Sequence, residues 1–414
     1  MKNISVSIVS IGTEILLGEI VNTNSQFLAV ELANMGINVF EMVTIGDNRE
    51  RLLEYFSCAL KKYDMVIATG GLGPTVDDIS KETACEFFGL TPVINEEQLE
   101  YIRKIFLRFG RPMTDNNIKQ AMFPESAVIL KNRAGSAPGC IIEKDGKKII
   151  LLPGPPNEMK QMFEREVKPI LSQLTDSVMY SEVVKVCGVG ESAMEEMVKD
   201  IIDEAVNPTV APYAKTGECR LRVTAKAENI ETAKELVAPV VKKLAERLGD
   251  NVYTVGNDTL AEVVVKKLIE KKLVITGAES CTGGLISSAL VDCPGVSAVL
   301  HESFVTYSND SKIWLLGVSA ETLKNFGAVS IECAAEMAEG LKNRSGADVT
   351  FAVTGIAGPD GGSEEKPVGT ICFALCHNGT TITELRRFNG DRTNIRIRAS
   401  IFMLDMIRRA VYLK

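Results

Sequence analysis

Histidine is scarce in this chain of 414 residues, and cysteine pairs with the spacing of a metal site are missing. The two histidines are His301 and His377. None of the ten cysteines belongs to a C-x-x-C pair, and Cys372 and Cys376 come closest to one. A zinc site cannot be assembled from these residues. We interpret the scattered cysteines as mostly reduced, small core residues of a cytoplasmic protein.

Long apolar runs and an excess of positive charge are missing as well. No run approaches the roughly 18 apolar residues that a membrane span needs. The N-terminal KNISVSIVSIG alternates apolar and polar residues, which predicts a first strand rather than a signal peptide. The formal net charge is −8, and a mildly acidic chain is a poor general nucleic-acid binder. We therefore expect neither a membrane nor a nucleic acid as partner.

The periodicity divides the chain into three blocks, residues 1–172, 173–255 and 256–414. Strands and helices alternate in the first block, with a hairpin at Asp145-Gly146, which predicts a mostly parallel, doubly wound α/β sheet. The second block reads as a small α+β module of KH or ferredoxin-like type, and we expect a spacer or dimerisation module there. The third block is again α/β.

The most informative stretch of the third block is AESCTGG, where an apolar strand ends and a helix begins. Ser280 and Cys281 are adjacent candidate nucleophiles. Gly283 and Gly284 would let a ligand approach the backbone, and a helix N-terminus favours developing negative charge. The alternative is a tight turn between strand and helix with no chemistry.

A serine nucleophile needs a base, and the chain has no G-x-S-x-G motif and no histidine in a recognisable pattern. A Ser–Lys arrangement fits better. In VTYSNDSK, Tyr307 ends a strand and Lys312 falls in the first turn of the next helix. The helix N-terminus and partial burial would both lower the pKa of this lysine. The alternative is a solvated surface lysine.

Two further stretches carry candidate binding residues. Thr354 and Gly355 end a strand before a Gly-Pro loop, which could be an ordinary turn. Arg392 and Arg396 begin the last helix, where an anionic ligand would relieve their unfavourable position. The alternative is that they flank the helix or pair with Asp391.

Five motifs of this block, AESCTGG, FVTYSNDSK, GAVS, TGIAGPDGGSEEKPVGT and FNGDR, resemble the C-terminal domain of the CinA family in the same order. The resemblance implies a nicotinamide-nucleotide amidohydrolase without a cofactor. Such an enzyme converts nicotinamide mononucleotide (NMN) to nicotinic acid mononucleotide and ammonia. It also implies Ser280 as nucleophile, Lys312 as base and Tyr307 as an assisting group. The implied substrate-binding set is Cys281, Thr282, Gly283, Gly284, Thr354, Gly355, Arg392 and Arg398.

In the first block, ATGGLGPTVDD places a glycine-rich loop between a strand and a predicted helix that Asp77 and Asp78 open. Such a loop suits a phosphate. It is not a Walker A loop, because the only G-K, Gly146-Lys147, lacks the following Ser or Thr. Carboxylates beside a phosphate indicate a divalent cation, with Glu14, Asp47, Asp77 and Asp78 as candidate ligands. The alternative for the two aspartates is helix N-capping.

GTEILLGEIVNTNS, TGGLGPTVDD, GSAPG and LPGPPNEMK resemble the N-terminal domain of the CinA family, which is similar to molybdopterin-binding domains. The resemblance implies hydrolysis of ADP-ribose to AMP and ribose 5-phosphate with Mg, Mn or Co, and with potassium as a further candidate ion. An older interpretation of this domain in the family is that it binds a pterin. The implied nucleotide-binding set is Gly70, Gly71, Gly73, Pro74, Thr75, Gly135, Pro138, Gly139, Gly154 and Pro155.

Taken together, these motifs predict a cytoplasmic, bifunctional salvage enzyme acting on NMN and ADP-ribose. The family resemblance adds the expectation of a homodimer. Two alternatives stay open. One is a non-catalytic competence or DNA-repair accessory protein, and the other keeps the fold but gives the first domain a molybdopterin-type ligand.

Overall fold

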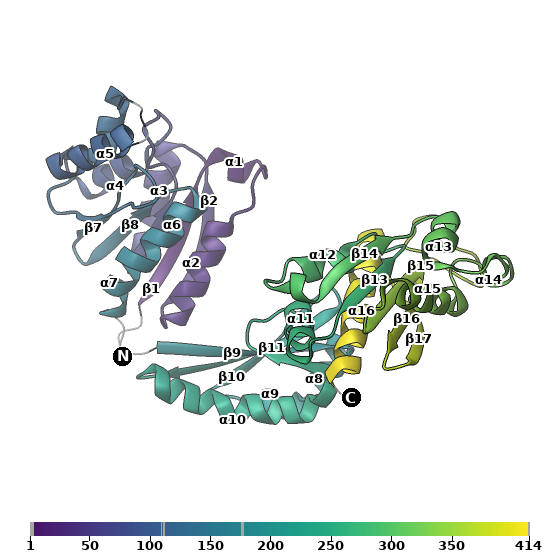
Figure 1. The fold of residues 1–414 in the computed structure, drawn as a ribbon. Coiled ribbons are helices and arrows are strands. Elements are labelled where there is room, and N and C mark those ends of the chain that lie inside the picture. The colour runs from purple at the N-terminus through teal and green to yellow at the C-terminus, as the bar shows by residue number, and fades with distance from the viewer. Residues whose placement is uncertain (1–3, 109, 111, 175–177, 413–414) are drawn as a thin grey trace. The chain divides into compact units, whose positions relative to one another are not determined.

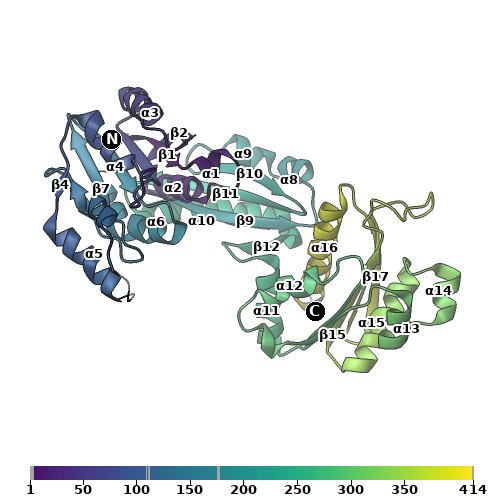
Figure 2. The same cartoon turned by 90° about the horizontal axis from the view of Figure 1, so that it is seen from above.

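The computed structural model describes residues 4–108, 110, 112–174 and 178–412. The chain forms two compact units, one of residues 1–180 with 226–234 and one of residues 181–225 with 235–414. Figures 1 and 2 show the elements of each domain. Within the described ranges, none of the helices combines the length and apolar content needed to cross a bilayer.

The N-terminal domain has a six-stranded sheet in the order β2-β1-β3-β8-β7-β6. The strands are β1 (Ser5–Ile11), β2 (Asn38–Ile45), β3 (Met65–Thr69), β6 (Val128–Leu130), β7 (Gly139–Lys144) and β8 (Lys147–Leu152). Strands β2, β1, β3 and β8 are parallel, whereas β7 and β6 are antiparallel to their neighbours. The sheet is therefore mixed, and β7 and β8 form the hairpin predicted at Asp145-Gly146.

Helices cover both faces of this sheet, as predicted for a doubly wound domain. One face packs against α3 (Arg49–Lys62) and α4 (Ser80–Phe88), and the other against α2 (Thr23–Asn34) and α6 (Pro156–Met162). Consecutive residues of β3 alternate between the two cores, with Val66 in one and Ile67 in the other. The remaining α-helices and strands are α1 (Thr13–Leu16), α5 (Glu96–Arg108), α7 (Lys168–Ser172) and the short pair β4 (Val93–Ile94) and β5 (Met122–Phe123).

The middle domain is a small antiparallel module with the strand order β10-β11-β9-β12. Its strands are β9 (Val178–Cys187), β10 (Thr209–Lys215), β11 (Glu218–Ala227) and β12 (Val252–Val255). Its helices are α8 (Glu191–Met197), α9 (Lys199–Asp203) and α10 (Ile230–Leu248). This is the α+β character expected from the sequence.

The C-terminal domain has a five-stranded mixed sheet, β14-β13-β15-β16-β17. Its strands are β13 (Ile275–Glu279), β14 (Leu300–Val305), β15 (Val349–Gly355), β16 (Thr370–His377) and β17 (Thr380–Arg387). Strands β14, β13 and β15 are parallel, and β16 and β17 are antiparallel. Because parallel strands end at the same edge, the loops after β13, β14 and β15 meet there.

Helices cover both faces of this sheet (Figures 1 and 2) and form a separate hydrophobic core with each. Helices α11 (Leu260–Lys271) and α16 (Arg392–Tyr412) pack on one face, and α15 (Ile331–Ser345) packs on the other. The helices α12 (Leu285–Val291), α13 (Asn309–Leu316) and α14 (Ala320–Phe326) complete the domain. All ten cysteines of the chain are free and only Cys58 is exposed, as expected for small core residues.

Candidate functional site

Ser280 and Lys312 meet at the edge where the parallel strands of the C-terminal domain end. Ser280 directly follows β13, and its backbone N–H donates to the carbonyl of Val353 on the neighbouring strand at 2.9 Å. Lys312 lies in the first turn of α13 and is 1% exposed, so the surface-lysine alternative is wrong. Its Nζ lies 3.3 Å from Ser280 Oγ.

The surroundings of Lys312 favour the neutral amine. Burial lowers its pKa below the ordinary value, with a smaller opposing effect from Cys333 and Cys281. Among the described residues, Lys312 forms no ion pair with a carboxylate. Its Nζ donates to the carbonyls of Thr306 at 2.8 Å and Tyr307 at 3.4 Å. In a neutral amine those two contacts use the two N–H bonds, which leaves the lone pair for the hydroxyl proton of Ser280.

Cys281 has the opposite electrostatic preference. It is 6% exposed, and burial raises the pKa of its thiol to about 12. A thiol is a poor nucleophile until it ionises. Of the two adjacent candidates, Ser280 is therefore the better nucleophile. It has a base beside it, and its hydroxyl does not have to ionise in a buried position before the attack.

The N-terminus of α12 is not open to a ligand, which corrects the expectation from the sequence. Glu279 is fully buried, and its carboxylate accepts hydrogen bonds from the backbone N–H groups of Gly284 at 2.9 Å, Ile286 at 3.2 Å and Ser287 at 2.8 Å. The Ser287 hydroxyl donates a fourth bond at 2.6 Å. The helix dipole is thus satisfied by the residue before Ser280, which also fixes the Ser280 loop.

The other predicted residues of this domain fall into two groups. Thr354 Oγ1 donates to the carbonyl of Ala328 at 2.8 Å. A Cβ on Gly355 would lie 2.4 Å from Ile371 Cδ1, so a larger side chain does not fit there. Tyr307 is 65% exposed, and its hydroxyl lies 3.3 Å from Arg392 Nη2. Arg392 also donates to the carbonyl of Gly358 at 2.6 Å. Tyr307 and Arg392 therefore form one polar contact beside the loop after β14.

Arg396, and not Arg398, reaches the Ser280 loop. Arg396 Nη2 donates to the carbonyl of Thr282 at 2.7 Å, and its buried Nε has no partner among the described residues. Arg398 instead lines a separate cavity of about 530 Å³ with Gly188 and Arg386. Two residues turn an α-helix by about 200°, so the two side chains leave opposite faces. Arg396, which its position at the start of the last helix had suggested, is therefore the arginine at this loop. Arg398, which the family resemblance implied, is not.

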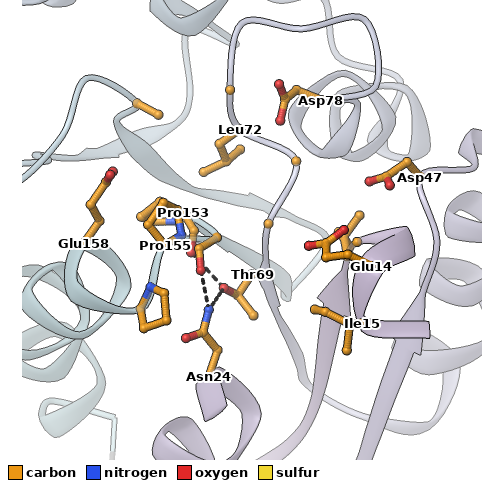
Figure 3. A pocket seen from close by; sticks show the side chains of 18 of the residues that line it. Glu14, Ile15, Asn24, Asp47, Thr69, Leu72, Asp78, Pro153, Pro155 and Glu158 are labelled. Atoms are coloured by element: carbon orange, nitrogen blue, oxygen red, sulfur yellow. Dashed lines mark hydrogen bonds between the residues drawn. The ribbon is translucent and has the colours of Figure 1, made fainter. Parts of the chain in front are cut away.

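A second candidate site is a cavity of about 640 Å³ in the N-terminal domain (Figure 3). It lies where β1, β3 and β8 end, the position at which ligands bind in open α/β sheets. Gly70 has φ 106°, and a Cβ there would lie 2.1 Å from the carbonyl oxygen of Ile11. Only glycine fits this turn. The predicted residues that line the cavity are Gly70, Gly71, Gly73, Pro74, Gly154, Pro155, Glu14, Asp47, Asp77 and Asp78.

Four predicted nucleotide-binding residues lie outside the lining. Thr75 donates from its N–H at 2.9 Å and its hydroxyl at 2.6 Å to Asp78 Oδ2. Gly135 packs on Glu158, and Gly139 lies in β7, where a Cβ would lie 2.4 Å from the carbonyl oxygen of Leu151. Pro138 is the fourth. Ser136 and Ala137 of the same loop do line the cavity.

The predicted metal ligands share this cavity without forming a coordination set. Asp47 Oδ2 accepts from the N–H of Thr13 at 3.0 Å and its hydroxyl at 2.8 Å, and Asp78 is held by Thr75 as above. In the part of the chain that the structure describes, no three His, Cys, Asp or Glu side chains converge to hold a metal ion. The capping alternative is also wrong for α4, which starts at Ser80 with Ile79 as its N-cap.

Comparison with known proteins identifies the family. Family models match residues 7–173 ("Probable molybdopterin binding domain"), 181–254 ("Damage-inducible protein CinA KH domain") and 257–411 ("CinA C-terminal domain"). A competence-damage inducible protein of Clostridioides difficile (strain 630) is 52% identical over 408 residues, 97% of this chain and 98% of the relative. The chain belongs to the CinA family.

Other CinA relatives also match over nearly their full length. A CinA-like protein of Kosmotoga olearia is 48% identical over 404 residues, 98% of each chain. A crystal structure of a competence/damage inducible protein from Agrobacterium tumefaciens is 44% identical and covers 37% of this chain and 96% of its own, with a TM-score of 0.35. The family assignment rests on the full-length relatives.

Several residues that line this cavity in the CinA-family chain were not singled out by sequence reasoning, among them Asn24, Thr69 and Glu158. Asn24 Nδ2 donates to Thr69 Oγ1 at 3.0 Å and to the carbonyl of Gly154 at 2.7 Å (Figure 3). Glu158 also lines the cavity, and Asn132 Nδ2 donates to its Oε2 at 2.6 Å. Asn24 belongs to the motif GEIVNTNS and Glu158 to LPGPPNEMK. The motifs therefore include both residues, but they do not indicate which contacts the two side chains make.

Proposed function

We propose that the C-terminal domain of this CinA-family chain hydrolyses the amide of NMN to nicotinic acid mononucleotide and ammonia. The observation that carries the proposal is the buried Lys312, whose Nζ lies 3.3 Å from Ser280 Oγ without a carboxylate partner among the described residues. An amine in that position is a general base for serine attack, as in other Ser–Lys hydrolases.

The reaction follows from this pair. The hydroxyl proton of Ser280 passes to Lys312 as Oγ attacks the amide carbon of NMN. The C–N bond breaks, and the departing ammonia takes the proton from Lys312, leaving an acyl ester on Ser280. Water then attacks the ester, its proton passes through Lys312 to Ser280 Oγ, and the acid product leaves.

Oxyanion and phosphate binding use groups that the fold leaves near this pair. The backbone N–H groups of Cys281 and Thr282 follow Ser280 and are directed at the Cys281 sulfur rather than at Glu279. As oxyanion donors they would exchange that weak acceptor for the developing charge of the intermediate. Arg396 keeps a buried Nε, without a partner in the described part of the chain, beside the same loop. A guanidinium with a free donor suits the 5′-phosphate of a mononucleotide, with Arg392 and Tyr307 at its border.

Ammonia release from NMN by wild type, Ser280→Ala, Lys312→Met and Cys281→Ala tests this assignment. We expect the first two variants to lose turnover and Cys281→Ala to keep most of it. If Cys281→Ala is the inactive variant, the site is a thiol amidase and the proposal is wrong. If wild type releases no ammonia, and instead shifts DNA in a gel at physiological salt, the accessory-protein alternative gains support.

For the N-terminal domain we propose hydrolysis of ADP-ribose to AMP and ribose 5-phosphate. The glycine loop at the strand ends and the cavity of about 640 Å³ support a phosphorylated nucleotide. A divalent cation bound there would neutralise the diphosphate. The carboxylates of the described residues do not form a coordination set by themselves. Competition between ADP-ribose and a pterin phosphate, measured by calorimetry, separates this proposal from the molybdopterin alternative.

Two further expectations complete the proposed function. We propose that the protein acts as a homodimer in the cytoplasm, as the family resemblance implies. Light scattering of the purified chain tests the dimer, and a monomer at micromolar concentration would exclude it.

A further inference from the structure

The turn between β10 and β11 of the middle domain contacts helix α16 of the C-terminal domain. Both elements lie in the same compact unit of the chain. In this turn, Thr216 Oγ1 donates to Asn394 Oδ1 at 3.2 Å. The next residue, Gly217, has φ 81°, and a Cβ there would lie 2.7 Å from Ile401 Cδ1. The turn therefore packs directly on the first half of α16.

Asn394 connects this contact to the beginning of α16. Its Nδ2 donates to Asp391 Oδ2 at 3.1 Å, and its backbone N–H donates to Asp391 Oδ1 at 2.8 Å. Asp391 immediately precedes the helix, so its carboxylate caps the first turn, where a negative charge is favoured. The Oδ1 of Asn394 is the acceptor for Thr216. One asparagine side chain thus joins the middle-domain turn to the cap of α16.

The beginning of α16 also carries Arg392 and Arg396, which the proposed function assigns to the phosphate of NMN. Arg392 donates to the carbonyl of Gly358 at 2.6 Å, and Arg396 donates to the carbonyl of Thr282 at 2.7 Å. The backbone hydrogen bonds of a helix hold neighbouring residues in a fixed relation, so a shift of this end moves both guanidinium groups together. The contact with the middle-domain turn therefore affects where both groups lie.

A second attachment holds the other half of α16 to the middle domain. Asp405 and Arg408 are each 5% exposed and form an ion pair at 2.7 Å. Arg408 Nη2 also donates to the carbonyl of Asp250 at 2.6 Å, and Arg409 Nη2 donates to Asn251 Oδ1 at 3.2 Å. Separating a buried ion pair is costly, so this half of the helix is fixed. The helix can then shift mainly by tilting about this end, and the β10–β11 turn restricts that tilt.

We propose that the β10–β11 turn positions the phosphate-binding arginines of the amidase site, with Thr216 and Asn394 as the positioning residues. The turn acts on substrate binding through α16 and takes no part in the attack by Ser280. This inference rests on the proposed function, and it gives the middle domain a role beyond that of a spacer. Ile395 and Ala399 also hold α16 in the core, so losing the turn contact should shift the helix only slightly.

The test compares two substrates that differ only in the phosphate, NMN and nicotinamide riboside. Thr216→Val keeps the shape of the side chain and removes the donor to Asn394. We expect KM for NMN to rise about threefold to tenfold, the equivalent of one hydrogen bond, with kcat unchanged. The kinetic constants for the riboside should stay as in wild type, because it has no phosphate for the arginines to bind. A merely structural defect would instead affect both substrates alike.

Ile401→Ala removes the apolar contact of the same turn from the side of the helix, and it should change KM for NMN in the same direction. Thr209→Val is the matched control, because it makes the same substitution at the opposite end of β10, where Oγ1 donates to the carbonyl of Thr224 at 3.4 Å. It should change neither substrate. Hydrogen exchange of residues 394–398 gives a measurement without turnover, and we expect faster exchange in Thr216→Val than in the control.

Three results would overturn the proposal, and they differ in what else they exclude. If Thr216→Val and Ile401→Ala change neither KM for NMN nor the exchange of residues 394–398, the turn does not position the arginines, while hydrolysis of NMN stands. If both variants weaken the two substrates equally, the role of the turn is only structural. If wild type hydrolyses neither substrate, the proposed function is wrong, and the positioning role is wrong with it.

Discussion

Glu279→Gln tests the idea that a buried carboxylate holds the Ser280 loop. Glu279 is fully buried, and its two oxygens accept four hydrogen bonds. Oε2 accepts from Gly284 and Ile286, and Oε1 accepts twice from Ser287. Glutamine keeps one acceptor oxygen and places an NH₂ group opposite the other two donors. Two bonds to a charged group are then lost where no water replaces them.

The expected loss follows from those two bonds. A hydrogen bond to a charged group contributes about 1.5–3 kcal/mol, so the free energy of unfolding should fall by about 3 kcal/mol or more. For a domain of this size that corresponds to a decrease in Tm of roughly 6 °C or more. Turnover of NMN should fall too, because Ser280 follows Glu279 directly.

The assay uses a probe confined to this domain. Trp314 in α13 is the only tryptophan of the chain, so its fluorescence anisotropy follows unfolding of the C-terminal domain. Hydrogen exchange of residues 280–290 adds a local measurement. The control is Glu262→Gln, the same substitution in the exposed capping box of α11, where a smaller change is expected. If Glu279→Gln lowers Tm no more than the control does, the carboxylate does not hold the loop and our reasoning is refuted.

Three further predictions concern titration. Burial raises the pKa of Cys281 to about 12, so iodoacetamide at pH 8 should label the exposed Cys58 and leave Cys281 unmodified. Mass spectrometry measures the labelling, and early modification of Cys281 would contradict this prediction. Burial lowers the pKa of Lys81 from 10.5 to about 8. Between those values the unfolded lysine is protonated and the folded one is not, so the free energy of unfolding should rise with pH by up to about 3 kcal/mol. Chemical denaturation should show this rise in wild type and not in Lys81→Met. Burial lowers the pKa of Lys312, so turnover of NMN should increase with pH and reach its plateau below pH 10.5, the ordinary pKa of lysine. A rate that falls as the pH rises over this range would exclude a neutral lysine base.

Much of the fold could be predicted because periodicity and turn residues are local properties. Alternating strands and helices gave the α/β class, and Asp145-Gly146 gave the β7–β8 hairpin. The strand order of each mixed sheet and the antiparallel edge of the C-terminal sheet were not predicted, since strand order depends on contacts between distant segments. The start of α4 was placed too early, because Asp77 and Asp78 resemble capping residues but belong to the loop before it.

Sequence alone placed Ser280 after a strand and Lys312 in the first turn of a helix, because both positions follow from neighbouring residues. Only the tertiary structure decided that the two meet, since 32 residues separate them and the order β14-β13-β15 brings their loops together. It also decided that Glu279 occupies the N-terminus of α12 and that Arg396 rather than Arg398 faces the loop. Burial, charge balance and the direction of a side chain depend on what packs around it, and no local pattern carries that information.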